Sequence, residues 1–152
     1  MVKFFISGGA GFIGSQLCEE IFSTFTKSQL IIYDKLTYAG NLNFLRNIIK
    51  SNRVKFIKGD IVDYKKYHQY LKNVDFAINV AAESHVDRSF KNSLLFTKSN
   101  TLGAHTFVQT CIENRVKKIV QISTDEVYGQ TLKGQKSEES LINPTNPYSA
   151  SK

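Results

Sequence analysis

Short apolar runs alternate with longer amphipathic stretches along the whole chain. Five of the runs are rich in Val, Ile and Phe, and they have the length and composition of strands that are buried on both faces. They cover residues 3–7, 30–33, 54–58, 76–80 and 118–123. Such runs predict a sheet whose two faces are both covered by helices.

The stretches between these runs have the periodicity of helices. Apolar residues recur at every fourth position early in the chain, at Ile13, Leu17, Ile21 and Phe25. A longer helix is predicted over residues 93–114, with part of one side lined by Leu94, Leu95, Leu102, Cys111 and Ile112. Five β–α units in series predict an α/β fold with a doubly wound parallel sheet.

Length, composition and charge limit the class of protein. A chain of 152 residues can form one core and predicts one domain. No segment approaches the roughly 20 apolar residues of a membrane span, and the N-terminus lacks a signal-peptide core, so we expect a cytoplasmic protein. The net charge of +7 comes from scattered lysines, which favours a solvated surface compatible with anionic small ligands over a nucleic-acid interface.

The two cysteines and one long polar segment add little chemistry of their own. Cys18 and Cys111 fall inside helical patterns without the spacing of a metal site, so we expect two buried thiols, no disulfide and no metal. Residues 130–146 are polar and predict a surface loop at the carboxyl edge of the sheet. A mobile active-site loop and an inert connector remain equally favoured there.

A glycine-rich segment, GGAGFIG at residues 8–14, follows the first strand and opens the first helix. Glycines at Gly8 and Gly11 suit a tight turn whose backbone approaches a pyrophosphate, and Gly14 lets the helix pack close to the strand. The N–H groups around Phe12 and Ile13 would then face the phosphates. The segment predicts a dinucleotide site.

An acidic residue at the end of the second strand strengthens that prediction. Asp34 comes 20 positions after Gly14, where a carboxylate can accept hydrogen bonds from the adenosine ribose. The carboxylate would repel a 2′-phosphate, which favours NAD over NADP, although Lys35 weakens this preference. Residues after the third and fourth strands complete the expected cofactor site, namely Asp60 and Ile61 at the adenine edge and the small residues Ala81 and Ala82.

Candidate reactive side chains follow the fifth strand. Tyr148 and Lys152 are four positions apart, a spacing that a shuffled chain of this composition contains about 0.7 times, so only their location gives it weight. On one helix face, Lys152 would lower the pKa of the Tyr148 phenol for proton exchange with a sugar alcohol. Thr124 is expected at the strand end, bonded to substrate and to Tyr148. The adjacent Asp125 and Glu126 can serve as one acid and one base.

Six segments together carry a resemblance to a known family. They are GGAGFIG (8–14), YDKLTYAGN (33–41), GDI (59–61), AAESHVDRS (81–89), STDEVYG (123–129) and NPYSASK (146–152). They closely resemble the dTDP-glucose 4,6-dehydratase family of extended short-chain dehydrogenases/reductases, whose NAD domain is Rossmann-like. The Thr-Asp-Glu triplet and LTYAGN are specific to this family, whereas the glycine loop and Tyr-x-x-x-Lys belong to the whole superfamily.

The resemblance implies a reaction and assigns roles within it. NAD would accept hydride from C4 of the sugar and return it to C6, giving a 4-keto-6-deoxy sugar nucleotide. Tyr148 would take the C4 hydroxyl proton, Glu126 the C5 proton, and Asp125 would protonate the departing C6 hydroxyl. Further residues are assigned to NAD (Leu36, Thr37, Thr101, Tyr148 and Lys152, with Asn100 as a support) and to substrate (Ser84, His85 and Thr124).

Family members are about twice as long as this chain, so the resemblance implies that residues 1–152 form an incomplete NAD-binding Rossmann domain. The last strands and the substrate domain would be absent. We therefore expect the 152 residues alone to be inactive, and we expect the full-length protein to be a homodimer, as the family is.

Several alternatives stay open. UDP-glucose could replace dTDP-glucose as the substrate of the same reaction. A nucleotide-sugar 4-epimerase would share the cofactor loop, Tyr148 and Lys152, but it has no need of the Asp125–Glu126 pair. A non-catalytic NAD-binding module needs only the glycine loop and Asp34. Nucleic-acid binding is the least favoured of these functions.

Overall fold

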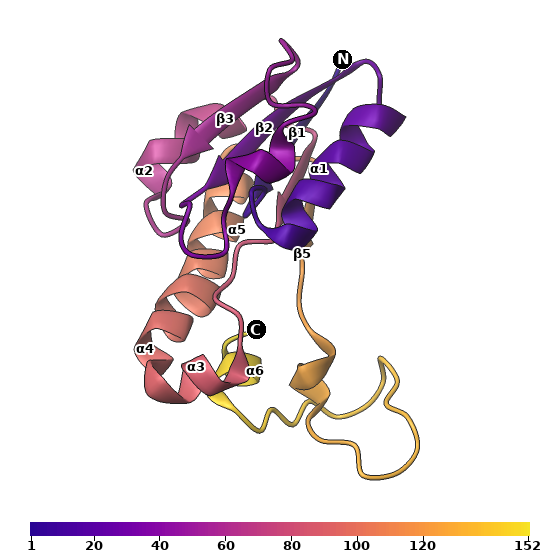
Figure 1. Cartoon of the computed structure of the whole chain (residues 1–152), viewed down its shortest axis with the longest axis vertical. Coiled ribbons are helices and arrows are strands. Elements are labelled where there is room, and N and C mark those ends of the chain that lie inside the picture. The colour runs from indigo at the N-terminus through magenta and orange to yellow at the C-terminus, as the bar shows by residue number, and fades with distance from the viewer. The chain divides into compact units, whose positions relative to one another are not determined.

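The computed structural model describes all residues, 1–152, and contains one parallel sheet of five strands (Figure 1). The strands are β1 (Val2–Ser7), β2 (Ser28–Asp34), β3 (Val54–Lys58), β4 (Phe76–Asn79) and β5 (Lys118–Gln121). Their order is β3-β2-β1-β4-β5, with every neighbouring pair parallel. Because the chain starts in the middle and winds outward in both directions, the predicted doubly wound α/β fold is confirmed.

The chain divides into two compact units, which are described separately. The first comprises residues 1–81 and 103–122, and the second comprises residues 82–102 and 123–152. The first unit holds the sheet with α1 (Phe12–Thr24), η1 (Leu42–Leu45), α2 (Tyr64–Tyr67), η2 (His68–Leu71) and α5 (Gly103–Glu113). Figure 1 shows α1 on one face of the sheet and α2 and α5 on the other.

The two faces of the sheet carry separate apolar cores, since successive side chains of a strand point to opposite faces. Phe5 of β1 packs with Tyr67 and Phe107 on the side of α2 and α5. Phe4 and Ile6 belong to the core on the side of α1 and η1. This arrangement accounts for the uninterrupted apolar runs in the sequence, because both faces of β1 and β2 are buried.

Helix α1 does not bury the whole apolar stripe that its sequence predicts. Ile13 and Phe25 are exposed, although Ile21 is buried. The side against the sheet also contains Gly14, Ser15 and Cys18, all buried. Small residues there allow the helix to approach β1 closely, so residue size matters as much as hydrophobic period.

The long helix predicted over residues 93–114 consists of three consecutive segments, α4 (Ser93–Phe96), the π-helical η3 (Thr97–Leu102) and α5. A π-helical turn shifts the face that a helix buries, so the buried residues differ from the predicted apolar stripe. Leu94, Leu102 and Ile112 are exposed. Of the predicted stripe, Cys111 is buried. The other buried residues are Phe96, Asn100, Gly103, Phe107 and Thr110.

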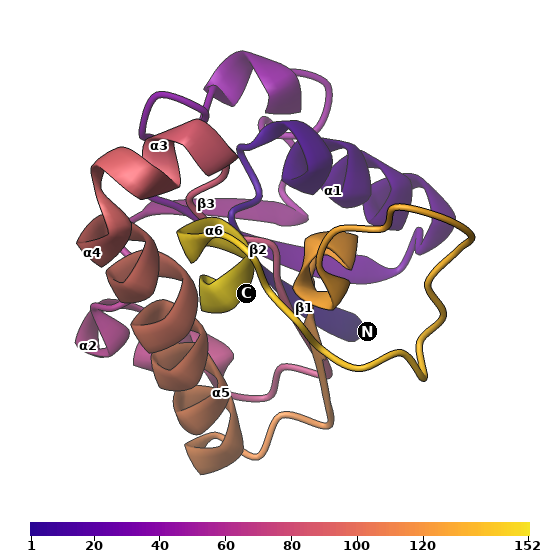
Figure 2. The same cartoon turned by 90° about the horizontal axis from the view of Figure 1, so that it is seen from below.

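The second unit contains α3 (Val86–Lys91), α4, η3, η4 (Asp125–Tyr128) and α6 (Pro147–Ser151). Helix α6 lies beside α3 and α4 (Figure 2). Residues 130–146 form no helix or strand and are almost all exposed, which confirms the predicted surface loop. Cys18 and Cys111 are free and buried, as expected. None of the helices has both the length and the apolar character needed to cross a membrane.

Candidate active site

The glycine loop between β1 and α1 has the backbone geometry that its sequence predicts. Gly8 has φ of +73°, and a Cβ there would lie 2.4 Å from the Ala81 backbone nitrogen, so no other residue fits. A Cβ on Gly14 would lie only 2.1 Å from the carbonyl oxygen of Gly8, the residue that directly follows β1, so the helix approaches the end of the strand closely. The turn is therefore fixed by contacts within the protein.

No side chain caps the N-terminus of α1. The helix begins at Phe12 after Gly11, which has extended backbone geometry and no side chain to cap the helix. The first N–H groups, on Phe12, Ile13 and Gly14, have no acceptor within the helix. A helix of 13 residues also places partial positive charge at this end, so the loop has the features of an anion site.

The Asp34 carboxylate is tied to this loop. It lies at the end of β2 and is 9% exposed. Oδ2 accepts a hydrogen bond from Ala10 N–H at 2.9 Å, and Oδ1 accepts one from Leu36 N–H at 2.7 Å. Leu36 has φ of +56°, a left-handed conformation that costs about 1 kcal/mol or more for a residue with a side chain. Each oxygen retains acceptor capacity for a ribose hydroxyl.

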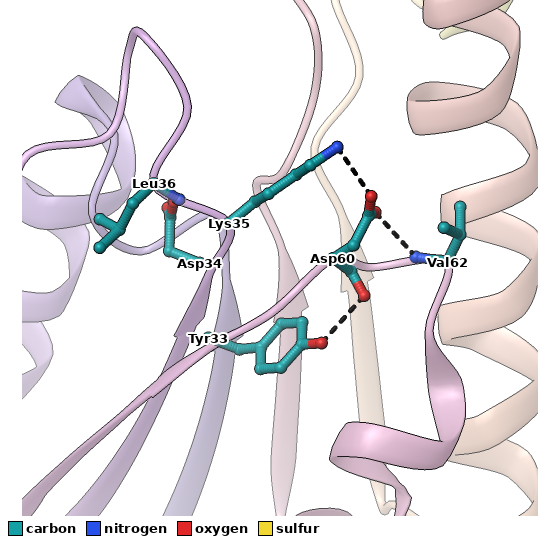
Figure 3. A network of polar contacts seen from close by, with 6 residues as sticks. All are labelled: Tyr33, Asp34, Lys35, Leu36, Asp60 and Val62. Carbon is teal, nitrogen blue, oxygen red and sulfur yellow. Dashed lines mark hydrogen bonds and ion pairs between the residues drawn. The ribbon is translucent and has the colours of Figure 1, made fainter.

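A second acidic residue is held at the neighbouring strand end (Figure 3). Asp60 follows β3, and its Oδ2 lies 2.8 Å from Lys35 Nζ, while its Oδ1 accepts from Val62 N–H at 3.2 Å. The Asp60 carbonyl accepts a hydrogen bond from the buried Tyr33 hydroxyl at 2.9 Å. Burial raises the pKa of Tyr33, with the charge of Asp63 as a further cause, so this phenol remains a donor at neutral pH.

The remaining predicted cofactor residues of the first unit have ordinary surroundings. Ile61 is part of the core next to α2, and Thr37 is exposed after β2. Ala81 follows β4, and its N–H donates to Asn79 Oδ1 at 3.1 Å. The structure thus places the glycine loop, Asp34, Asp60 and Ala81 at the carboxyl ends of β1 to β4, the end at which open α/β sheets bind ligands.

In the second unit, Thr124 lies three residues beyond the end of β5 and not at the strand end that the sequence predicts. The strand is shorter because the sheet ladder stops after Gln121, and Thr124 instead begins η4 as its N-cap. Its Oγ1 accepts from Glu126 N–H at 3.3 Å and lies 3.4 Å from Asp125 Oδ1. A bond from Thr124 to Tyr148 stays a prediction.

Glu126 contacts the helix that carries Tyr148. Its Oε2 accepts a hydrogen bond from Asn146 Nδ2 at 3.0 Å. Asn146 is also the N-cap of α6 and forms a reciprocal capping box with Ser149, followed by proline at the first helical position. The carboxylate and the start of the helix are therefore fixed to each other.

Tyr148 and Lys152 are placed at opposite ends of the short helix α6. The Tyr148 ring meets the Phe96 ring edge-on, with centroids 6.2 Å apart and planes at 79°. Lys152 caps the helix, where its N–H donates to the Ser149 carbonyl at 3.3 Å. Burial lowers the pKa of the Lys152 ammonium, because a charged group loses hydration there.

The buried side chain of Asn100 joins three segments of the second unit. Its Oδ1 accepts from Glu83 N–H at 2.8 Å, and its Nδ2 donates to the Glu83 carbonyl at 3.0 Å and to Ser151 Oγ at 2.9 Å. Thr101 adds a bond from its hydroxyl to the Ser151 carbonyl at 3.2 Å. Both residues belong to η3, and π-helical turns are frequent at functional sites.

Sequence reasoning missed four residues of this site. They are Glu83, Phe96, Asn146 and Ser151. The sequence does contain a signal for Asn146, because asparagine three residues before serine, with proline next, is a capping pattern. The other three are recognised only from their contacts. Glu83 is 8% exposed, and its Oε2 has no hydrogen-bond partner.

The predicted substrate residues follow directly after Glu83. Ser84 is half-buried. Ala82, which precedes Glu83 and is a predicted cofactor residue, is exposed. His85 has φ of +80° and precedes α3, so its backbone is held in a conformation that L-residues rarely adopt. Such strained positions concentrate at functional sites. The second unit thus contains a phenol, an ammonium group, carboxylates and hydroxyls on short helical elements.

Comparison with known proteins identifies the family of this chain. Residues 5–152 match the family model described as GDP-mannose 4,6-dehydratase. The chain belongs to this family. The resemblance to dTDP-glucose 4,6-dehydratases is confirmed by sequence, since the chain is 42% identical to the dTDP-D-glucose 4,6-dehydratase of Dictyostelium discoideum over 99% of its own length.

Solved structures give the same result for the fold. The dTDP-glucose 4,6-dehydratase of Streptomyces venezuelae, crystallised with NAD bound, is 38% identical and superposes with a TM-score of 0.95 over 99% of this chain. The UDP-Glc/GlcNAc 4-epimerase of Campylobacter jejuni is 28% identical, with a TM-score of 0.90 over 99% of this chain.

Each of these relatives is more than twice as long as the chain. The chain spans 38% of the Dictyostelium protein, 48% of the Streptomyces chain and 46% of the Campylobacter chain.

Proposed function

We propose that this chain is the NAD-binding and catalytic half of a nucleotide-sugar 4,6-dehydratase that converts dTDP-glucose to dTDP-4-keto-6-deoxyglucose and water. One observation carries the proposal. Glu126, from the triplet specific to dehydratases, accepts a hydrogen bond from Asn146 at the start of the helix that bears Tyr148. The residue proposed as the elimination base is thus hydrogen-bonded to the N-cap of the helix whose second residue is the proposed redox phenol.

The first unit fits NAD. The open N–H groups of Phe12, Ile13 and Gly14 would meet the pyrophosphate, and Asp34, fixed by Ala10 N–H, would accept from the adenosine ribose. Asp60 with Ile61 would read the adenine, beside Leu36, Thr37 and Ala81. The bound cofactor would supply the acceptor of hydride from sugar C4 and the donor of hydride to C6.

The second unit supplies the proton transfers. Tyr148 would remove the C4 hydroxyl proton, and the neighbouring Lys152 ammonium would stabilise the phenolate. Glu126 would remove the C5 proton and return it to C5 when hydride adds at C6. Asp125 would give a proton to the C6 hydroxyl as it leaves as water, and the proton that Tyr148 takes from the C4 hydroxyl would restore the balance through solvent. Thr124 would donate to the C4 oxygen, with Ser84 and His85 on the substrate side and Thr101 on the cofactor side.

A second function, nucleotide-sugar 4-epimerase, has one observation in its favour, the TM-score of 0.90 to the Campylobacter epimerase. Epimerisation at C4 eliminates no water, so it gives no reason for the adjacent Asp125 and Glu126. The lower identity of 28% also favours the dehydratase. UDP-glucose as the substrate of a dehydratase is supported by a 38% identical plant relative named for UDP-glucose 4,6-dehydratase activity.

Two experiments test the proposal. Calorimetric titration of the 152-residue chain with NAD tests the cofactor site, and saturable binding is expected. A chimera in which residues 1–152 replace the matching half of the Streptomyces dehydratase tests the chemistry, with the product identified by NMR. Formation of the 4-keto-6-deoxy product, and its loss in Glu126→Gln, would support a dehydratase. A C4 epimer that retains its C6 oxygen would refute it.

We also propose that the complete protein acts in the cytoplasm. A dinucleotide cofactor and two free buried thiols agree with the reducing cytoplasm. A homodimer of the complete protein is proposed on family resemblance. The 152 residues alone are expected to lack turnover, since the chain spans less than half of the relatives.

A further inference from the structure

The ion pair between Lys35 and Asp60 joins the ends of two adjacent strands. Lys35 directly follows β2, and Asp60 lies two residues after β3, whose last residue, Lys58, is paired with Asp34. The distance from Lys35 Nζ to Asp60 Oδ2 is 2.8 Å, with side chains 49% and 27% exposed. Figure 3 shows the Lys35 side chain reaching across to Asp60, while the Asp34 carboxylate lies by Leu36 N–H.

Asp60 is anchored independently of Lys35. Its backbone carbonyl is held by the Tyr33 hydroxyl and by Asp63 N–H, and its Oδ1 by Val62 N–H. The lysine, in contrast, is a flexible side chain on an exposed residue. The pair therefore holds the lysine against a fixed carboxylate, and the lysine is the member free to move when that partner changes.

The pairing determines the charge that a nucleotide would meet. Lys35 and Asp60 together carry no net charge, so the carboxylate of Asp34 remains the uncompensated charge beside the proposed ribose site. A 2′-phosphate carries about −1.5 to −2 charges at neutral pH and would face that carboxylate. A ribose 2′-hydroxyl would instead donate to it.

We propose that the Lys35–Asp60 ion pair is a selectivity element, in which Asp60 withholds the Lys35 ammonium from the 2′-position and so preserves discrimination against 2′-phosphorylated dinucleotides. The inference rests on the proposed NAD site and goes beyond it. Sequence alone suggests the opposite, that a lysine beside Asp34 weakens the preference for NAD. The 2.8 Å pairing removes that effect.

The test is a set of three variants in which the combined charge of the side chains at positions 35 and 60 is changed. Asp60→Asn keeps an oxygen for Val62 N–H and gives the pair a charge of +1. Lys35→Met keeps most of the chain length and gives −1. The double variant returns the pair to zero. Calorimetry on each 152-residue chain would measure dissociation constants for NAD and NADP, and for ADP-ribose with and without a 2′-phosphate.

The ratio of the NADP to the NAD dissociation constant should follow the charge of the pair. We expect it to fall about three- to tenfold in Asp60→Asn, to rise about two- to fivefold in Lys35→Met, and to return within about twofold of wild type in the double variant. These shifts in the ratio should be smaller in 0.5 M salt. The Debye length is ~10 Å at about 0.1 M salt and is shorter at fivefold higher salt, so the charges are screened more strongly. Lost adenine contacts weaken both ligands and cancel in the ratio.

Three results would overturn the inference, and they separate it from the proposed function. An Asp60→Asn ratio within twofold of wild type, or a double variant that keeps the Asp60→Asn shift, would refute the role of the ion pair while leaving NAD binding intact. A wild-type chain with native circular dichroism that binds neither NAD nor ADP-ribose would refute the cofactor site and the selectivity together.

Discussion

A methyl group at position 14 should damage the glycine loop from inside the protein. In Gly14→Ala, the new Cβ would lie 2.1 Å from the Gly8 carbonyl oxygen and 2.9 Å from the Gly9 Cα. Both are backbone atoms, so the gap between loop and helix must widen by about 1 Å to reach ordinary contact. Forced expansion of this kind costs about 1–3 kcal/mol.

Part of that cost is offset, because alanine favours the helix over glycine by up to about 1 kcal/mol. The net loss of about 1–2 kcal/mol should lower Tm by about 2–8 °C. The displaced loop should also lose at least one charge-assisted contact with the pyrophosphate, which weakens NAD binding about tenfold or more. Differential scanning calorimetry and NAD titration measure the two effects.

Gly11→Ala is the matched control. A Cβ there meets the Gly8 carbonyl oxygen at 3.4 Å, an ordinary contact, and the backbone has φ of −77°, which alanine adopts freely. We expect its Tm to change by less than about 2 °C, while its methyl group obstructs the pyrophosphate and weakens NAD binding. Equal Tm values for the two variants, or full NAD affinity in Gly14→Ala, would refute the steric reasoning.

Three further predictions follow from the contacts and pKa shifts. Burial raises the pKa of Cys18 and of Cys111 from 9.0 to about 12, so unfolded thiols ionise above pH 9 before native ones do. The free energy of unfolding measured in urea should therefore fall between pH 9 and 12. The native protein should also resist thiol reagents at pH 8, and rapid labelling of the native protein would contradict the burial of the two thiols. Asn100→Leu leaves buried polar groups unpaired, so it should lower the free energy of unfolding by about 2–4 kcal/mol and speed hydrogen exchange in α6. Unchanged exchange in α6 would show that the hydrogen bonds of Asn100 do not hold this helix. Asn146→Ala removes the cap of α6 and the hydrogen-bond donor to Glu126, so the free energy of unfolding measured in urea should fall by about 1 kcal/mol. Asn146→Thr should restore part of the cap.

The sheet could be predicted from the sequence because its signals are local. Each strand of the sheet contains an apolar run, and Asp34 and Asp60 follow from the ends of two of them. The glycine loop could also be predicted, since glycine is required by its positive φ and by close contact. These features depend on a few neighbouring residues, which is the range over which sequence patterns carry information.

The contacts that organise the second unit could not be predicted in the same way. Asn100 and Ser151 are 51 residues apart, and no period or spacing connects them. The partner of Lys35 is 25 positions away on another strand end, and neither side chain indicates the other. The exposed Ile13 shows the further limit that periodicity identifies a helix without fixing which face packs closest.

The π-helical turn η3 makes the length of one short segment as important as its composition. Such turns arise from a single extra residue in an α-helix. Deletion of one residue among positions 97–99 would restore α-helical hydrogen bonding but rotate Asn100 by about 100° relative to α4, away from Glu83 and Ser151. Substitutions on the exposed positions of η3 should be tolerated, whereas a one-residue indel should release the helix that carries Tyr148.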